Sequence, residues 1–218
     1  MTKISEQALH NVTEDDHARI TATIRKVEKK TSGEVYAVVA HQSDDYFYVA
    51  GFMAALWALL LGFLLAVAMS FLEFPITPIA LALAQLASFA FFMILFHFYP
   101  ALRLIFVPRS ISYRRASHNA VRQFMAHGIH TTSERSGVLL FVSLAEHYAE
   151  VVADAGINEK VEQFEWDEMV ATLVQHAAKG EVANGFVDAI EQAGGLLAQH
   201  FPPQKGQLNE LDDRLVEI

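Results

Sequence analysis

The histidines and carboxylates of this sequence are the side chains most able to do chemistry. Ten histidines are scattered along the chain. His127 and His130 flank Gly128-Ile129 and could bind a metal ion as a pair, but solvated loop histidines are the favoured interpretation. His97 lies in a long apolar stretch, where ionisable groups often mark function. The first apolar segment offers no opposing histidine for a haem, so a ligand or proton-relay role for His97 is the less favoured alternative.

A run of acidic residues could also bind a cation. Its members are Glu162, Glu165, Asp167 and Glu168. Acidic side chains are stabilised in the first turn of a helix by the helix dipole. We therefore interpret this run as the start of a helix, with a metal site as the alternative.

Several kinds of chemistry are excluded by composition. The chain has no cysteine, which rules out disulfides, thiolate catalysis, zinc–thiolate sites and iron–sulfur clusters. It has no phosphate loop, dinucleotide fingerprint, HExxH or GxSxG motif. The net charge of -9 argues against nucleic acid as a partner, because no basic excess exists to neutralise phosphates.

An apolar region from about Tyr46 to Leu102 separates two polar flanks. Between Asp45 and Arg103, Glu73 and His97 are the only ionisable acid or base. Two segments, Tyr48–Phe71 and Ile79–Tyr99, each have the ~20 residues that cross a bilayer, and a loop with two prolines joins them. The flanks are too small to bury such a hairpin inside a soluble core. The sequence therefore predicts an integral membrane protein with the lipid bilayer as a partner.

The orientation of this hairpin is predicted from its basic flanks. Four arginines follow the second segment closely, namely Arg103, Arg109, Arg114 and Arg115, whereas the short loop has no lysine or arginine. Basic residues stay on the cytoplasmic side. The N-terminal residues form no apolar run, so no signal peptide is expected. We expect the inner or cytoplasmic membrane, with both termini and the soluble part facing the cytoplasm.

Small residues recur at four-residue spacing in both segments, at Gly51/Ala55, Gly62/Ala66 and Ala80/Ala84/Ser88. Such faces allow close helix packing in lipid. The favoured interpretation is that the two segments pack on each other; the alternative is that one face meets a partner membrane protein. Gln85 and Ser88 could supply an interhelical hydrogen bond.

The pattern of the two polar flanks predicts one small α/β domain. The expected helices begin at Thr13, at Ser110 or Ser112, at Trp166 (to Lys179) and at Val182 (to His200), and the expected strands are Glu34–Ala40, Gly137–Ser143 and Tyr148–Ala153. The strand–helix–strand order makes the first two strands parallel. A short turn makes the third strand antiparallel. The predicted fold class is α/β, a small αβα-type domain with a mixed sheet.

The C-terminal tail carries its own pattern. Leu208, Leu211, Leu215 and Ile218 recur at three- and four-residue spacing, which is typical of one amphipathic helical stripe. We favour packing of this tail on its own domain over docking on a partner. The expected segments are 1–45 and 103–203 for the soluble domain, 46–102 for the transmembrane hairpin and 204–218 for the tail.

The stretch SGVLLFVSLAEHYAEVVADAGINEKV resembles the core of the TPM domain, the family of thylakoid acid-phosphatase-like and photosystem-repair proteins. Gly137–Val142, Glu150–Ala153 and Gly156-Ile157 match the family pattern of strand, short turn, strand and Gly-x-Gly. The opening helix and strand, and Gly185-Phe186 late in the chain, also match. The resemblance covers nearly all of the polar flanks and none of the hairpin. It implies a fold of this family and, for some members, phosphatase activity or calcium binding.

The family's acidic site is altered in this sequence. Asp154 stands where the first glycine is expected, Asn158 replaces a glutamate, and Gln163 falls near the usual aspartate. A hard cation needs several converging carboxylate oxygens. The resemblance therefore leaves Asp154 and Asn158 as the metal candidates, with calcium as the candidate ion, while we expect no catalytic residue and no cofactor.

The functional hypothesis combines the hairpin with this altered site. We expect a membrane-anchored, non-catalytic TPM-like domain that binds an integral membrane protein complex, as an accessory subunit or as an assembly or repair factor. The alternative is a metal-dependent phosphatase of the TPM family. Convergence of Asp154, Asn158 and either Asp15 or Asp16 in one pocket would favour the alternative.

Overall fold

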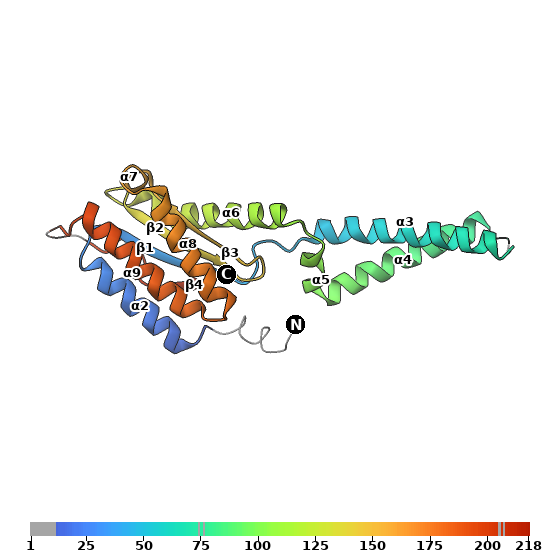
Figure 1. Cartoon of the computed structure of the whole chain (residues 1–218), viewed down its shortest axis with the longest axis horizontal. Helices are drawn as coiled ribbons and strands as arrows, with labels where there is room; N and C mark the ends of the chain where they lie inside the picture. The colour runs from blue at the N-terminus through green and yellow to red at the C-terminus, as the bar shows by residue number, and fades with distance from the viewer. Residues whose placement is uncertain (1–11, 74, 76, 205, 207) are drawn as a thin grey trace. The chain divides into compact units, whose positions relative to one another are not determined.

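The computed structural model describes residues 12–73, 75, 77–204, 206 and 208–218. Contacts within the chain divide it into two compact units (Figure 1). The α/β unit is built from the described residues up to Ser43 and from Tyr113 to Ile218, and the helical unit is Asp44–Ser112.

A four-stranded mixed sheet is the centre of the α/β unit as far as the chain is described. Its strands are β1 (Glu34–Ala40), β2 (Gly137–Ser143), β3 (Tyr148–Ala153) and β4 (Leu215–Glu217), in the order β3-β2-β1-β4. Strand β1 is parallel to both β2 and β4, and β2 is antiparallel to β3. The predicted parallel pair and antiparallel hairpin are confirmed.

Helices cover both faces of this sheet. One face packs against α2 (Glu14–Glu28), α8 (Gln163–Ala178) and α9 (Val182–His200), and the other packs against α6 (Arg109–Ala126) (Figure 1). Alternate residues of β1 point to opposite faces: Val35, Ala37 and Val39 join the first core, while Tyr36, Val38 and Ala40 join the second. Burial on both faces explains the uninterrupted apolar run of β1. The α/β fold class is confirmed.

Local sequence signals fix the helix starts. Thr13 caps α2 in a capping box with Asp16, as its sequence indicated. Helix α8 begins at Gln163, three residues before the predicted Trp166, because Glu162 and Glu165 form a capping box there. Helix α6 begins at Arg109, slightly before the predicted serines. The short elements are α5 (Pro100–Ile105), the 3₁₀ turn Ile129–Thr131 and α7 (Ala155–Asn158).

The tail packs on its own domain, but the predicted amphipathic helix is wrong. The described residues end in β4, which pairs with Ala37–Val39 of β1. His41 N–H donates to Ile218 C=O (2.9 Å), and Ile218 N–H donates to Val39 C=O (3.0 Å). A helix this short is marginal alone, whereas the edge of β1 offers unpaired backbone groups that a strand can satisfy. The apolar residues of the tail consequently separate: Leu215 is buried and Leu208 is exposed.

The helical unit is dominated by two long apolar helices, α3 (Phe47–Phe71) and α4 (Pro78–Phe98), which pack against each other. Both are long and apolar enough to cross a membrane. Only 17% and 6% of the residues in their most apolar windows are buried. Core helices of soluble proteins are mostly buried, so these helices expose an apolar surface that water does not favour.

The helix pair is closely packed where Gly62 meets Gln85. A β-carbon at Gly62 would lie 2.6 Å from Gln85 Nε2, so a larger residue at position 62 would require the Gln85 side chain to move. Ser88 does not form the expected interhelical bond, because its hydroxyl donates to Ala84 C=O of its own helix (2.8 Å). A serine hydroxyl in a helix readily binds the carbonyl one turn earlier, and this bond satisfies it locally.

A cleft at the carboxyl ends of the parallel strands

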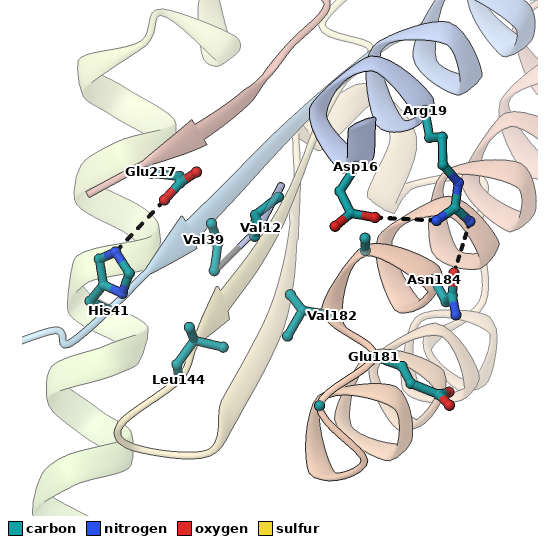
Figure 2. A pocket seen from close by; sticks show the side chains of 12 residues that line it. Val12, Asp16, Arg19, Val39, His41, Leu144, Glu181, Val182, Asn184 and Glu217 are labelled. Carbon is teal, nitrogen blue, oxygen red and sulfur yellow. Dashed lines mark hydrogen bonds and ion pairs between the residues drawn. The ribbon is translucent and has the colours of Figure 1, made fainter. Parts of the chain in front are cut away.

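The three parallel strands end around a cleft of about 250 Å³ (Figure 2). His41 directly follows β1, Leu144 directly follows β2, and Glu217 is the last residue of β4. The carboxyl ends of parallel strands meet at one edge of a sheet, where ligands of open α/β folds usually bind. The topology therefore places this cleft at the position that favours a binding site.

One wall of the cleft is polar and joins two helices. Arg19 of α2 donates to Asp16 Oδ1 (3.2 Å) and to Asn184 Oδ1 of α9 (2.8 Å) (Figure 2). Asp16 also accepts hydrogen bonds from the backbone and the hydroxyl of Thr13. The Thr13 hydroxyl is the main reason why the pKa of Asp16 lies below its ordinary value. Asp16 is therefore ionised at neutral pH and holds Arg19 in place.

The opposite wall is formed by a carboxylate between two histidines. Glu217 Oε1 lies 2.6 Å from His17 Nε2, and Glu217 Oε2 lies 3.7 Å from His41 Nε2. His17 belongs to α2 and His41 follows β1, so Glu217 connects the edge strand to both. The cleft thus has polar groups of both signs on its walls.

The base of the cleft is apolar and small. Val39, Leu144 and Val182 line it. The first turn of α9 also contributes to the wall, and its N-cap residue Glu181 makes no capping bond because its carboxylate binds His176 Nδ1 (3.1 Å). Typical small-molecule pockets enclose roughly 300–1,000 Å³. The cleft is therefore suited to one side chain, a chain end or a small polar molecule.

The sequence-predicted metal candidates lie at the other end of the sheet. Asp154 follows β3 and caps α7, where its Oδ1 accepts from Ala155 N–H (2.5 Å) and lies 3.4 Å from Arg135 Nε. Asn158 is exposed, and its amide donates to Ala153 C=O (3.1 Å). Asp154 N–H binds Gly137 C=O, at the amino end of β2. Asp154 and Asn158 are therefore neighbours, but neither lines the cleft that contains Asp16.

The other chemical candidates have structural partners. Glu162 and Glu165 form the α8 capping box, in agreement with the helix-start interpretation. His127 and His130 lie in the turn that follows α6, and both are half-buried. His127 Nδ1 lies 2.9 Å from the Tyr36 hydroxyl, and the His130 ring lies near Phe124. Their rings complete the core beneath α6, which the sequence pattern did not reveal.

A second group of acids lies where the tail returns to the sheet. Glu28 accepts from Val35 N–H (3.0 Å) and shares a hydrogen bond with Asp213. Burial, opposed by the Val35 bond, raises the pKa of Glu28 to about 9. Burial also raises the pKa of Glu34, which accepts from Glu210 N–H (3.3 Å). These carboxyls hold the tail in place and favour protonated forms.

The polar cleft residues were not identified from the sequence. His41 could have been found, because residues that follow a parallel strand are natural site residues. Glu217 could not, since the tail pattern indicated a helix and gave no sign that it reaches the sheet. Arg19 lies on the exposed side of an amphipathic helix, where charged residues are common, and Asn184 is a half-buried residue in the first turn of α9.

Comparison with known proteins places the α/β unit in context. The TPM domain family model matches residues 101–196. Among solved structures, the NMR structure of BA42 protein from the psychrophilic bacterium Bizionia argentinensis is similar, with a TM-score of 0.59 and 20% sequence identity over 96% of this chain and 97% of that one. At this identity the likeness concerns the fold alone. No curated protein matches the chain significantly.

These findings confirm the resemblance to the TPM domain. The matched segment begins after α4 and ends within α9, so it contains β2, β3 and the helices around them. The hairpin α3–α4 lies outside it and interrupts the chain between β1 and β2. The chain thus combines a segment that matches the TPM domain model with two long apolar helices that lie outside it.

Proposed function

We propose that this protein is a membrane-anchored, non-catalytic TPM-like domain that supports a membrane protein complex. The observation that carries the proposal is the exposed apolar surface of α3 and α4. Large side chains such as Phe52, Phe63 and Phe91 are at least 60% exposed. Burying each such side chain is worth about 1.5–3 kcal/mol, so a bilayer around the helices stabilises them strongly.

The lengths of the helices suit a bilayer. At about 1.5 Å per residue, α3 (25 residues) spans roughly 37 Å and α4 (21 residues) roughly 31 Å. A hydrocarbon core is about 30 Å thick. Both helices can therefore cross it, with the short loop after Phe71 on the far side.

The proposed orientation keeps the α/β unit in the cytoplasm. Arg103 and the arginines of α6 follow α4 without any intervening carboxylate, which favours the cytoplasmic side for both termini. Protease added to right-side-out vesicles should leave the C-terminal residues intact. Cleavage of the α/β unit under these conditions would contradict this orientation.

The cleft supports a binding role. Its walls present the side chain of Arg19, the amide of Asn184 and the carboxylate of Glu217 around an apolar base, which can recognise a peptide segment of a partner. Substrate chemistry would need a group positioned to react. In the cleft the charged groups instead hold one another, as the Arg19–Asp16 and Glu217–His17 pairs do.

Co-purification from mild detergent tests the binding role. Arg19→Ala should lose an integral membrane partner that the wild-type chain retains. Lys29→Ala is the matched control, because it removes a positive charge from the opposite end of the same helix. Equal recovery of the partner by both variants would contradict a role for the cleft.

A metal-dependent phosphatase is the second candidate, and one observation favours it. Asp154 is 4% exposed, and its Oδ2 has no hydrogen-bond partner among the described residues. A cation such as calcium could use this oxygen together with the Asn158 side chain. Phosphate release by the detergent-solubilised chain with calcium or magnesium, lost in Asp154→Asn, would support this candidate. Equal release by both chains would exclude Asp154 from such a site.

A further inference from the structure

One segment of the chain carries a net positive charge because it lacks carboxylates. Residues 74–133 contain five of the sixteen lysines and arginines and none of the twenty-five carboxylate side chains. The rest of the chain is therefore strongly acidic. Helix α6 lies within this segment and begins shortly after α4 ends at Phe98.

The outer face of α6 combines this charge with apolar side chains. Its exposed residues recur at helical spacing and are Arg114, Arg115, His118, Val121, Arg122 and Met125. Val121 is 47% exposed and Met125 is 54% exposed. The buried side of the same helix, with Ala116, Ala120 and Phe124, packs on the sheet. The outer face is thus not needed for the core of the domain.

The arginines of this outer face have different hydrogen-bond partners from Arg103, the arginine nearest to the hairpin. Arg103 donates to Phe96 C=O (2.8 Å) and to Asp45 C=O (3.1 Å), so it stabilises the hairpin base. Arg122 instead has one contact along its own helix, to Asn119 Oδ1 (2.8 Å). The carboxylate of Glu150 accepts from Ser117 (3.2 Å), on the flank of α6 that faces β3. Among the described residues, Arg114 and Arg122 form no ion pair with a carboxylate, so these two charges are available to a ligand.

We propose that the outer face of α6 binds the headgroups of anionic phospholipids. The proposal rests on the membrane anchoring described above, which keeps α6 close to a bilayer by covalent connection. Arginines on an interfacial helix attract anionic headgroups, and apolar residues such as Val121 and Met125 can enter the boundary between headgroups and acyl chains. Such a contact favours the cytoplasmic leaflet, because anionic lipids make its surface negative.

The absence of cysteine makes a site-specific test possible. The full chain with Val121→Cys carries a fluorophore on the outer face of α6, and Gln175→Cys on α8 is the control on the opposite side of the sheet. Both are reconstituted into phosphatidylcholine vesicles with or without phosphatidylglycerol, and quenching by doxyl-labelled lipid is measured. We expect phosphatidylglycerol to raise quenching severalfold at position 121 only. High salt should reverse this rise, because it screens exposed charges.

The double variant Arg114→Gln/Arg122→Gln should abolish most of the rise without changing the circular dichroism spectrum. Equal quenching at position 121 in both vesicle types, or an unchanged response of the double variant, would overturn the proposal. If the fluorophore at position 121 is shielded from water in native membranes but not in anionic vesicles, a protein partner covers this face, and the lipid proposal is overturned.

Flotation of the same vesicles separates this proposal from the anchoring proposal. Inserted chain floats in neutral and anionic vesicles alike, whatever α6 does. A chain that binds only anionic vesicles and is released by salt would refute the anchoring and retain the lipid contact of α6. A chain that floats with neither vesicle would refute both.

Discussion

Two consecutive glycines of α9 show how single residues control this fold. A β-carbon on Gly194 would lie 2.5 Å from Val27 Cβ of α2, whereas a β-carbon on Gly195 would meet nothing within 4 Å. The first glycine therefore permits close packing of α2 on α9, and the second only adds flexibility to the unfolded chain.

This pair gives a matched prediction. Gly194→Ala should destabilise the domain by about 1–3 kcal/mol, because overpacking forces α2 and α9 apart. Gly195→Ala should be neutral or stabilising by up to about 1 kcal/mol, because alanine favours helix. Thermal unfolding in detergent measures both. Equal effects of the two substitutions would show that the α2–α9 contact is not as close as described.

Glu28 predicts the pH dependence of stability. Its folded pKa is about 9, against an ordinary value of 4.5. Below pH 4.5 the carboxyl is protonated in both states. Between pH 4.5 and 9 the unfolded state ionises while the folded state stays protonated, so stability falls as pH rises.

Glu28→Gln should remove this loss, since glutamine cannot ionise and can keep the hydrogen bond from Val35. We expect the melting temperature of the variant to exceed that of wild type by a few degrees at pH 8 and to approach it at pH 4. A variant that is less stable at pH 8, or equally shifted at both pH values, would disagree with a protonated Glu28.

At the residue scale, the sequence predicted side chains whose partners lie a few positions away in the chain. The Thr13 cap and the Glu162 helix start depend on residues three positions apart, which a sequence pattern contains. The Glu217–His17 contact joins residues 200 positions apart. Such contacts depend on sheet topology, and the sequence pattern cannot indicate which edge the tail occupies.

The elements were predicted well where hydrophobic period and length agree. Strands β1 and β2 and helix α9 have the expected boundaries because long apolar runs or helical stripes end at glycine, serine or proline. The prediction of a helix in the tail was wrong for a physical reason. Spacings of three and four residues also occur in a segment that is not helical. Here Leu208 is exposed, Leu211 packs on the core at the α6 side of the sheet, and Leu215 is buried at the α2 side.

Strand β4 gives a prediction at the element scale. Leu215 is 3% exposed in the core on the α2 side, whereas Leu208 is 78% exposed. Leu215→Ala should cost about 2–5 kcal/mol, as for other buried leucines. Leu208→Ala should change stability by less than about 0.5 kcal/mol. Chemical denaturation of the two variants measures the difference, and a neutral Leu215→Ala would mean that β4 contributes little.

At the scale of the whole molecule, the domain should fold without its inserted hairpin. Strands β1 and β2 pair along their full lengths although the hairpin separates them in sequence. The entropic cost of closing a loop changes only logarithmically with its length. Replacing residues 46–102 with a short Gly/Ser linker should leave a soluble α/β unit with a cooperative thermal transition. An expanded product that binds ANS would show that the hairpin is needed for folding.

The extraction of the protein by alkaline carbonate tests the central claim most directly, because carbonate releases peripheral proteins and leaves membrane-spanning ones in the pellet. The account predicts that the full chain stays in the membrane pellet, while the variant with a linker in place of residues 46–102 appears in the supernatant. Release of the full chain into the supernatant would contradict the claim that α3 and α4 anchor this protein in a bilayer.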